Sequence, residues 1–360
     1  MVQAHIRYIV KTKRFWASLL LVQFLLFLIL SKSKWVVFGF ELFFKWRKPI
    51  QQLFFYWMPF SVGDLGYLVL GLMLAYFLIK IIHKKTRSKF SLRLLIFLNV
   101  FYFLYQIVWG MLYFQAPIIE KLSASPLTTN EKKVLTEKYL NLCLKDRLLV
   151  KENKNGVFDI EDIKPVQEEI IRQQKILPKF INNKTPSQLV DFKPSFYSFV
   201  MNYTGILGYY NPFTAEAQYN PNMPEMQLPF TLAHESAHQI GYAREEEANF
   251  IGYLIGKDSE NISLRYSTEY FVLKSLLNDL YYDDKDFVDS VFSRYSKGMK
   301  RDEAYEKDFY KSHQGIVADF FAEANDLFLK SNRQDGSISY SYFVDLLIRY
   351  EQINKKDPKK

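Results

Sequence analysis

Three long apolar runs dominate the first third of the chain. They cover residues 15–30, 65–82 and 94–114, and the first of them contains no charged side chain. Runs of this length and composition are typical of helices that cross a lipid bilayer. No small-residue cleavage signal follows the first run at residues 31–34, so we expect an uncleaved anchor. The pattern predicts an α-helical membrane domain over residues 1–114 with three transmembrane helices.

Clusters of positive charge precede the first apolar run and separate the second run from the third. Two segments carry lysine and arginine but no acid: the start of the chain (Arg7, Lys11, Lys13, Arg14) and the link between the second and third runs (Lys84, Lys85, Arg87, Lys89, Arg93). Such segments stay in the cytoplasm of bacteria. We therefore expect a multi-pass protein of the bacterial inner membrane, in contact with the lipid bilayer, whose residues 115–360 form an extracytoplasmic domain.

The orientation of residues 115–360 depends on whether the segment 31–62 crosses the membrane. It is aromatic between residues 35 and 60, with interspersed charge, and it carries five basic side chains. We expect a helix or hairpin that lies in the outer membrane interface. If the segment crossed the membrane instead, residues 115–360 would face the cytoplasm.

The pattern changes after residue 117 to mixed charge with a helical period. Thr128 and Glu131 can cap a helix that runs to about residue 151, and Pro165 suits the first turn of a second helix. Further amphipathic helices are expected over residues 263–282, 284–295, 301–332 and 340–353. Residues 205–220 are rich in Gly, Asn and aromatics and lack the helical period. We therefore expect a mainly α-helical soluble domain with a small β element.

Net charge and cysteine content exclude some of the functions that the chain could have. The net charge of the 360 residues is +9, which would suit a nucleic-acid partner, but the basic side chains cluster beside the apolar runs. We therefore expect no nucleic-acid partner. Cys143 is the only cysteine, which excludes an intrachain disulfide and a cysteine-based metal site.

The run His234-Glu235-Ser236-Ala237-His238 carries the clearest chemistry. Residues four apart lie on the same face of a helix, so His234 and His238 can bind one Zn²⁺ ion. Glu235 would then lie beside the ion as a general base, as in the H-E-x-x-H arrangement of zinc hydrolases. The alternative is an ordinary helix with two polar histidines.

A third ligand requires the chain to turn back. On one unbroken helix Glu245 would lie about 10 Å from His238 along the axis, too far to share an ion. Gly241 is placed to end the first helix, and a second helix would begin near Arg244.

Three acids then fall in the first turn of this second helix, where acids also favour the helix dipole. We expect Glu245 to be the ligand, with Glu246 and Glu247 as alternatives. Asn249, four residues after Glu245, can accept the other ring N–H of a ligand histidine.

These residues resemble two groups of proteins. The motif with a downstream glutamate is similar to the gluzincin class of zinc peptidases. More closely, the chain resembles a bacterial membrane family catalogued as domain of unknown function 3810, in stretches at residues 109–117, 208–214, 229–231, 234–253 and 339–340. Asn249 stands where the gluzincin pattern often has Asp, and the gap between His238 and Glu245 is unusually short.

The resemblance implies a zincin-like α+β domain. It also implies that an edge strand within residues 207–220 lies beside the cleft and pairs with extended substrate. A β-hairpin that merely covers the core is the alternative at this position.

Together these features predict a membrane-anchored zinc metallopeptidase that acts on a peptide or protein at the outer membrane face. Glu235 would accept a proton from zinc-activated water. A second group would stabilise the oxyanion, and the candidates are Tyr209, Tyr210, His313 and Tyr340. Two other functions fit the same residues: a zinc amidohydrolase that acts on cell-wall peptide, and a non-catalytic membrane scaffold that retains a zinc site.

Overall fold

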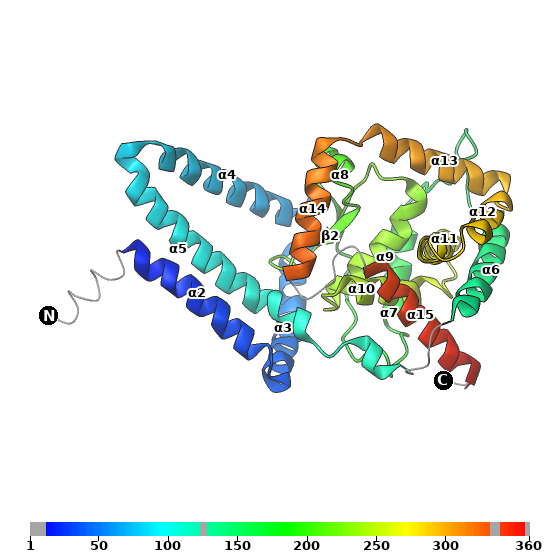
Figure 1. The fold of residues 1–360 in the computed structure, drawn as a ribbon, viewed down its shortest axis with the longest axis horizontal. Helices are drawn as coiled ribbons and strands as arrows, with labels where there is room; N and C mark the ends of the chain where they lie inside the picture. Colours follow the sequence, from blue (N-terminus) through cyan, green and yellow to red (C-terminus); the bar gives the residue numbers. More distant parts are fainter. Residues whose placement is uncertain (1–11, 123–127, 332–338, 357–360) are drawn as a thin grey trace.

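Three apolar helices extend from one side of a larger helical body (Figure 1). The computed structural model describes residues 12–122, 128–331 and 339–356. Helices α2 (Lys13–Leu30), α4 (Val62–Ile82) and α5 (Lys84–Val108) are long and apolar enough to cross a membrane, and α5 packs against both of the others. The prediction of three such helices is confirmed.

The third apolar helix ends earlier than predicted. It stops at Val108, and the 3₁₀ segment η1 (Gly110–Phe114) follows a break at Trp109, where φ is −146° and ψ is −51°. The rings of Trp109 and Tyr113 pack with Phe44 and Tyr210 in a buried cluster. Distant parts of the chain hold these aromatic side chains, so the backbone leaves the helix at Trp109. The apolar helix therefore does not extend to residue 114.

Helix α3 (Lys34–Phe55) lies in the segment 31–62, for which the sequence left open an interfacial or a membrane-crossing position. It is a single helix, and it is not among the candidate membrane spans of the described residues. In Figure 1 it runs across the ends of the apolar helices that meet the larger body. One face bears exposed aromatics such as Trp35 and Trp46, whereas Arg47 and Gln51 on another face donate hydrogen bonds to the carbonyl of Pro212.

The larger body is mainly helical. Its helices are α6 (Thr129–Asp146), α7 (Lys164–Gln174), α8 (Ser198–Thr204), α9 (Leu228–Gln239), α10 (Glu245–Gly256), α11 (Ile262–Leu280), α12 (Lys285–Ser293), α13 (Lys297–Ser312), α14 (Ile316–Ser331) and α15 (Ser339–Lys356), with 3₁₀ turns η2 (Ile118–Lys121) and η3 (Glu225–Gln227). The predicted caps are present: Thr128 and Glu131 form a capping box, and proline occupies the first turn of α7. Helices α9, α10 and α11 pack on one another, and α6, α7 and α15 pack around them.

The helix predicted over residues 301–332 is two helices, α13 and α14. The chain leaves the helical conformation at His313, whose Nδ1 bonds to the carbonyl oxygen of Phe309, and passes through Gly315 with a φ of +155°. The apolar period continues across this break, so hydrophobic patterning alone does not reveal it.

A small three-stranded sheet lies against α9. Its strands are β1 (Phe192–Pro194), β2 (Gly208–Tyr210) and β3 (Ala217–Tyr219), in the order β1-β3-β2. Strand β3 runs parallel to β1 and antiparallel to β2, with Tyr209 opposite Gln218. The small β element is therefore confirmed, with β2 at an edge of the sheet, and β1 is an addition that the sequence pattern did not indicate.

Helix α4 begins on this sheet. The backbone N–H groups of Val62 and Gly63 donate to the buried carboxylate of Glu216, at 3.1 and 2.6 Å. Asp64, in the same first turn, accepts a bond from Phe196 N–H at 2.7 Å and from the Ser195 hydroxyl at 3.0 Å. The Glu216 carboxylate satisfies N–H groups that a helix start leaves unpaired and favours the helix dipole. Together with the bonds of Asp64, it attaches the start of α4 to the larger body.

Candidate metal centre

Two helices bring three ligand atoms together. His234 and His238 lie on α9, with their Nε2 atoms 3.2 Å apart, and Glu245 begins α10. A carboxylate oxygen of Glu245 lies 3.2 Å from His234 Nε2, and the other lies 3.6 Å from His238 Nε2. Tetrahedral ligands at bond lengths of about 2.0–2.1 Å are spaced about 3.3 Å apart. With one ligand atom taken from each residue, the three atoms lie within 4.8 Å of one another, so these side chains could hold one ion.

The predicted reversal between the helices is at Gly241. Its φ is +103°, a conformation that favours glycine, and its N–H donates to the carbonyl of His238 at 2.9 Å. A Cβ atom here would also meet the ring of Phe44 at 2.8 Å. The second helix starts after Arg244, as the distance argument required.

Hydrogen bonds orient both rings. His234 Nδ1 lies 2.7 Å from Asn249 Oδ1, and His238 Nδ1 lies 2.6 Å from the carbonyl oxygen of Tyr242. A carbonyl oxygen only accepts, so each Nδ1 donates a proton to it, and each Nε2 is turned toward Glu245 and the other ring. The sequence predicted the contact of Asn249. It gave no signal for the Tyr242 carbonyl, because every residue has one.

Two ring nitrogens and a carboxylate that face one another favour positive charge between them, either a proton on an imidazole or a metal ion. Burial lowers the pKa of His238, but the carboxylate of Glu245 more than offsets this and raises the pKa to about 9. Burial would raise the pKa of Glu245, yet the two imidazoles hold it well below its usual range. The site therefore favours positive charge, and its two imidazole nitrogens, once deprotonated, and one carboxylate are a donor set that suits Zn²⁺.

Glu235 lies beside this site and is 4% exposed. Burial raises the pKa of its carboxyl to about 7, and Glu245 adds to the shift while the imidazoles oppose it. Its Oε2 atom has no hydrogen-bond partner among the described residues. A carboxyl group with a pKa near neutrality can both accept and return a proton.

Of the three consecutive acids, only Glu245 joins the histidines. Glu247 is buried, accepts a bond from the backbone N–H of Ile118 at 2.7 Å and lies 3.6 Å from Arg244. Burial raises the pKa of Glu246 to about 7. In the described part of the chain, the group with metal-ligand spacing is His234, His238 and Glu245.

The structure describes the side chains of three of the four oxyanion candidates, Tyr209, Tyr210 and His313. The Tyr209 hydroxyl bonds to the carboxylate of Asp64 and lies 3.0 Å from Ser195 Oγ, so its polar end is engaged at the start of α4. Tyr210 is buried, with its ring 4.8 Å from that of Trp109.

The other two candidates lie later in the chain, His313 directly after α13 and Tyr340 on α15. His313 Nδ1 bonds to the carbonyl of Phe309 at 2.7 Å, and its ring contacts Tyr203. Tyr340 lies on α15, but its side chain is outside the described residues. The Tyr209 hydroxyl and His313 Nδ1 are therefore each bonded to a partner other than the three ligands.

Three residues that sequence analysis did not single out shape the site. A Cβ at Gly208 would lie 2.8 Å from Glu235 Cγ and Oε1, so this glycine lets β2 approach the carboxylate. A Cβ at Gly252 would lie 3.1 Å from the backbone nitrogen of His234, so this glycine lets α10 approach α9. The Trp109 ring lies 6.0 Å from that of His238. Of these three residues, only Gly252 had a signal in the sequence, because a glycine inside a helical pattern can indicate close packing.

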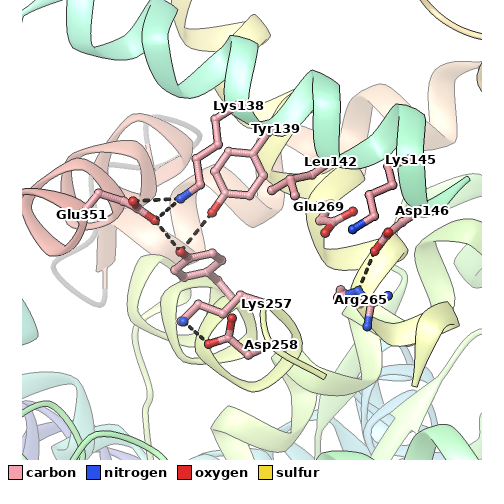
Figure 2. Close-up of a pocket in the computed structure, with 11 residues that line it drawn as sticks. Lys138, Tyr139, Leu142, Lys145, Asp146, Lys257, Asp258, Arg265, Glu269 and Glu351 are labelled. Atoms are coloured by element: carbon pink, nitrogen blue, oxygen red, sulfur yellow. Dashed lines mark hydrogen bonds and ion pairs between the residues drawn. The ribbon is translucent and has the colours of Figure 1, made fainter. Parts of the chain in front are cut away.

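Figure 2 shows a separate pocket of about 290 Å³ lined by α6, α10, α11 and α15. No ligand of the candidate metal centre lines it. Its charges largely pair within the protein: Lys138 bonds to Glu351, and Arg265 bonds to Asp146. We therefore treat it as distinct from the metal centre.

Comparisons with known proteins give a family but no function. No curated protein matches the chain, and no solved structure matches it. The sequence model of the family described as "Protein of unknown function (DUF3810)" matches residues 40–348, which is most of the chain. The chain therefore belongs to the DUF3810 family.

Proposed function

We propose that this protein is a membrane-anchored zinc metallopeptidase with a zincin-like domain, which hydrolyses peptide bonds at the outer face of the inner membrane. The observation that carries the proposal is the convergence of His234, His238 and Glu245, with the buried carboxyl of Glu235 beside them. Three protein ligands leave one position open on a tetrahedral ion, which is the pattern of catalytic zinc sites.

Each residue has a defined part in this reaction. The three ligands would hold one Zn²⁺ ion, which, when bound, supplies a water of pKa about 7 and polarises the scissile carbonyl. Glu235 accepts the proton of the attacking water and returns it to the leaving amine. Asn249 and the Tyr242 carbonyl keep the two imidazole rings oriented.

The position of β2 favours a peptide as substrate. One edge of β2 pairs with β3, and no strand of the described residues pairs with the other edge. Extended peptides bind to such edges through main-chain hydrogen bonds. Because Gly208 of β2 is packed against Glu235, a peptide on this edge would pass close to the general base.

Contacts with the apolar helices favour action near the membrane. The ring of Trp109, just after α5, lies 6.0 Å from that of His238, and Phe44 of α3 packs at Gly241. Tyr209 of β2 bonds to Asp64 in the first turn of α4. Trp109 and Asp64 lie at the ends of α5 and α4 that meet the larger body, and Phe44 lies within α3 at the same junction. The positive charges on the opposite ends of the spans favour the outer face.

Substitution of Glu235 by Gln tests the proposal. The full chain in lipid should retain zinc, but its turnover of a mixed fluorogenic peptide library should fall about 10²–10⁴-fold, because the amide cannot accept the proton. Glu246→Gln is the matched control, since this acid lies outside the ligand group, and it should retain activity. Equal peptide turnover in Glu235→Gln and wild type would refute the assignment. Wild-type turnover of cell-wall fragments, with none of peptides, would favour an amidohydrolase.

A further inference from the structure

Apolar side chains are exposed on α8, on the segment just before it, and on α14. Phe199 on α8 is 70% exposed, and Phe196 and Val200 beside it are also exposed. On α14, Ile316 is 88% exposed and Phe320 is 64% exposed, with Leu327 on the same face. We call these six residues the α8/α14 apolar face. Soluble proteins rarely expose such a group of large apolar side chains unless it contacts a partner.

This face adjoins the start of a candidate membrane span. The residues that begin α8 are bonded to the first turn of α4: Phe196 N–H donates to Asp64, and the Tyr197 hydroxyl donates to the carbonyl of Asp64 at 2.7 Å. The ring of Phe196 stacks on that of Phe60, just before α4. Helix α14 packs on α8. The α8/α14 apolar face is therefore continuous with the point where α4 meets the larger body.

The direction of α14 also suits a membrane surface. In Figure 1 α14 lies at the edge of the larger body that faces the apolar helices, and it runs across their direction. Its acids Asp319, Glu323 and Asp326 follow one side of the helix, and Phe320 and Phe321 lie on the other side. Ile316 and Leu327 lie at the boundary, next to Glu323. A helix that lies in the plane of a membrane interface has this division into apolar and charged sides.

We propose that the α8/α14 apolar face lies in the outer surface of the lipid bilayer and seats the larger body on the membrane beside α4. A lipid surface is the occupant that the geometry favours, because α4 is a candidate membrane span and Phe196 is bonded to Asp64 in its first turn. Aromatic side chains are enriched at the membrane–water interface in membrane proteins. The proposal does not depend on zinc or on peptidase activity.

Fluorescent labels on single cysteines test the proposal in the full chain. Phe199→Cys and Phe320→Cys are labelled with an environment-sensitive maleimide dye and reconstituted in vesicles whose lipids carry bromine on the acyl chains. Val200→Cys and Ile316→Cys are a second pair on the same face. Cys143 is fully buried, and the labelled wild type measures any background from it.

Controls come from positions of similar exposure elsewhere. Leu72→Cys in α4 should be quenched by brominated lipid, whereas Leu148→Cys and Tyr282→Cys, both exposed on other parts of the body, should not. We expect labels at residues 199 and 320 to be quenched to an extent comparable with residue 72. Emission that matches residues 148 and 282 would overturn the proposal. An apolar emission spectrum without quenching by lipid would also overturn it, because a protein, either a second copy or another partner, would then cover the face.

Discussion

Replacement of Asn249 by Ala should weaken zinc binding while the protein remains folded. The Asn249 oxygen accepts the Nδ1–H of His234 at 2.7 Å, and Asn249 is buried between α9 and α10. Loss of the acceptor leaves a buried N–H without a partner, which costs about 1–3 kcal/mol. Because each 1.4 kcal/mol is tenfold in affinity, this is about 5–150-fold in the zinc dissociation constant. In other metal sites, loss of the hydrogen-bond acceptor of a ligand histidine lowers metal affinity or activity about 10–100-fold.

Competition with a chromophoric zinc chelator measures this change on the detergent-purified full chain. Asn249→Asp retains an acceptor oxygen and adds a negative charge, so its zinc affinity should equal or exceed that of wild type. Asn141→Ala, at an exposed position on α6, is the matched control and should bind zinc as wild type does.

The result that would refute this reasoning is specific. If Asn249→Ala unfolds at the wild-type temperature and binds zinc with wild-type affinity, the Asn249 contact does not orient a ligand. If Asn249→Ala and Asn249→Asp lose affinity equally, the size of the side chain matters and its acceptor oxygen does not.

Two further substitutions probe the surroundings of the site. Gly208→Ala places a Cβ 2.8 Å from the carboxylate of Glu235, so it should lower peptide turnover at unchanged zinc content. Gly66→Ala, where a Cβ meets nothing within 4 Å, should leave both unchanged, and equal activity of the two variants would contradict the packing argument. Burial raises the pKa of Asp191 to about 7, so the folded state binds its proton more tightly than the unfolded state, and stability falls as pH rises from about 4 to 7. Asp191→Asn should therefore be more stable than wild type at pH 8, by up to about 4 kcal/mol at 1.36 kcal/mol per pKa unit, and should lose this advantage near pH 4. Unfolding temperatures across this pH range measure the difference, and a pH-independent difference would contradict the buried-carboxyl explanation.

The sequence alone determined the features that depend on local periodicity and chain geometry. Long apolar runs predict apolar helices without knowledge of their neighbours. The four-residue spacing of His234 and His238 places both rings on one face, and the distance to Glu245 requires a reversal at Gly241. Each inference concerns residues that are consecutive or close together in the sequence, where backbone geometry limits the outcomes.

Tertiary structure decided between residues that local geometry alone cannot distinguish. Glu245, Glu246 and Glu247 share the first turn of α10, and the approach of α10 to α9 at Gly252 determines which of them meets the histidines. The Tyr209 hydroxyl was a candidate for the site, but Asp64, far away in the sequence, binds it. The third apolar helix ends at Val108 because distant rings surround Trp109. Contacts of this kind depend on how whole elements pack, since the energy that selects them comes from partners that are remote in the chain.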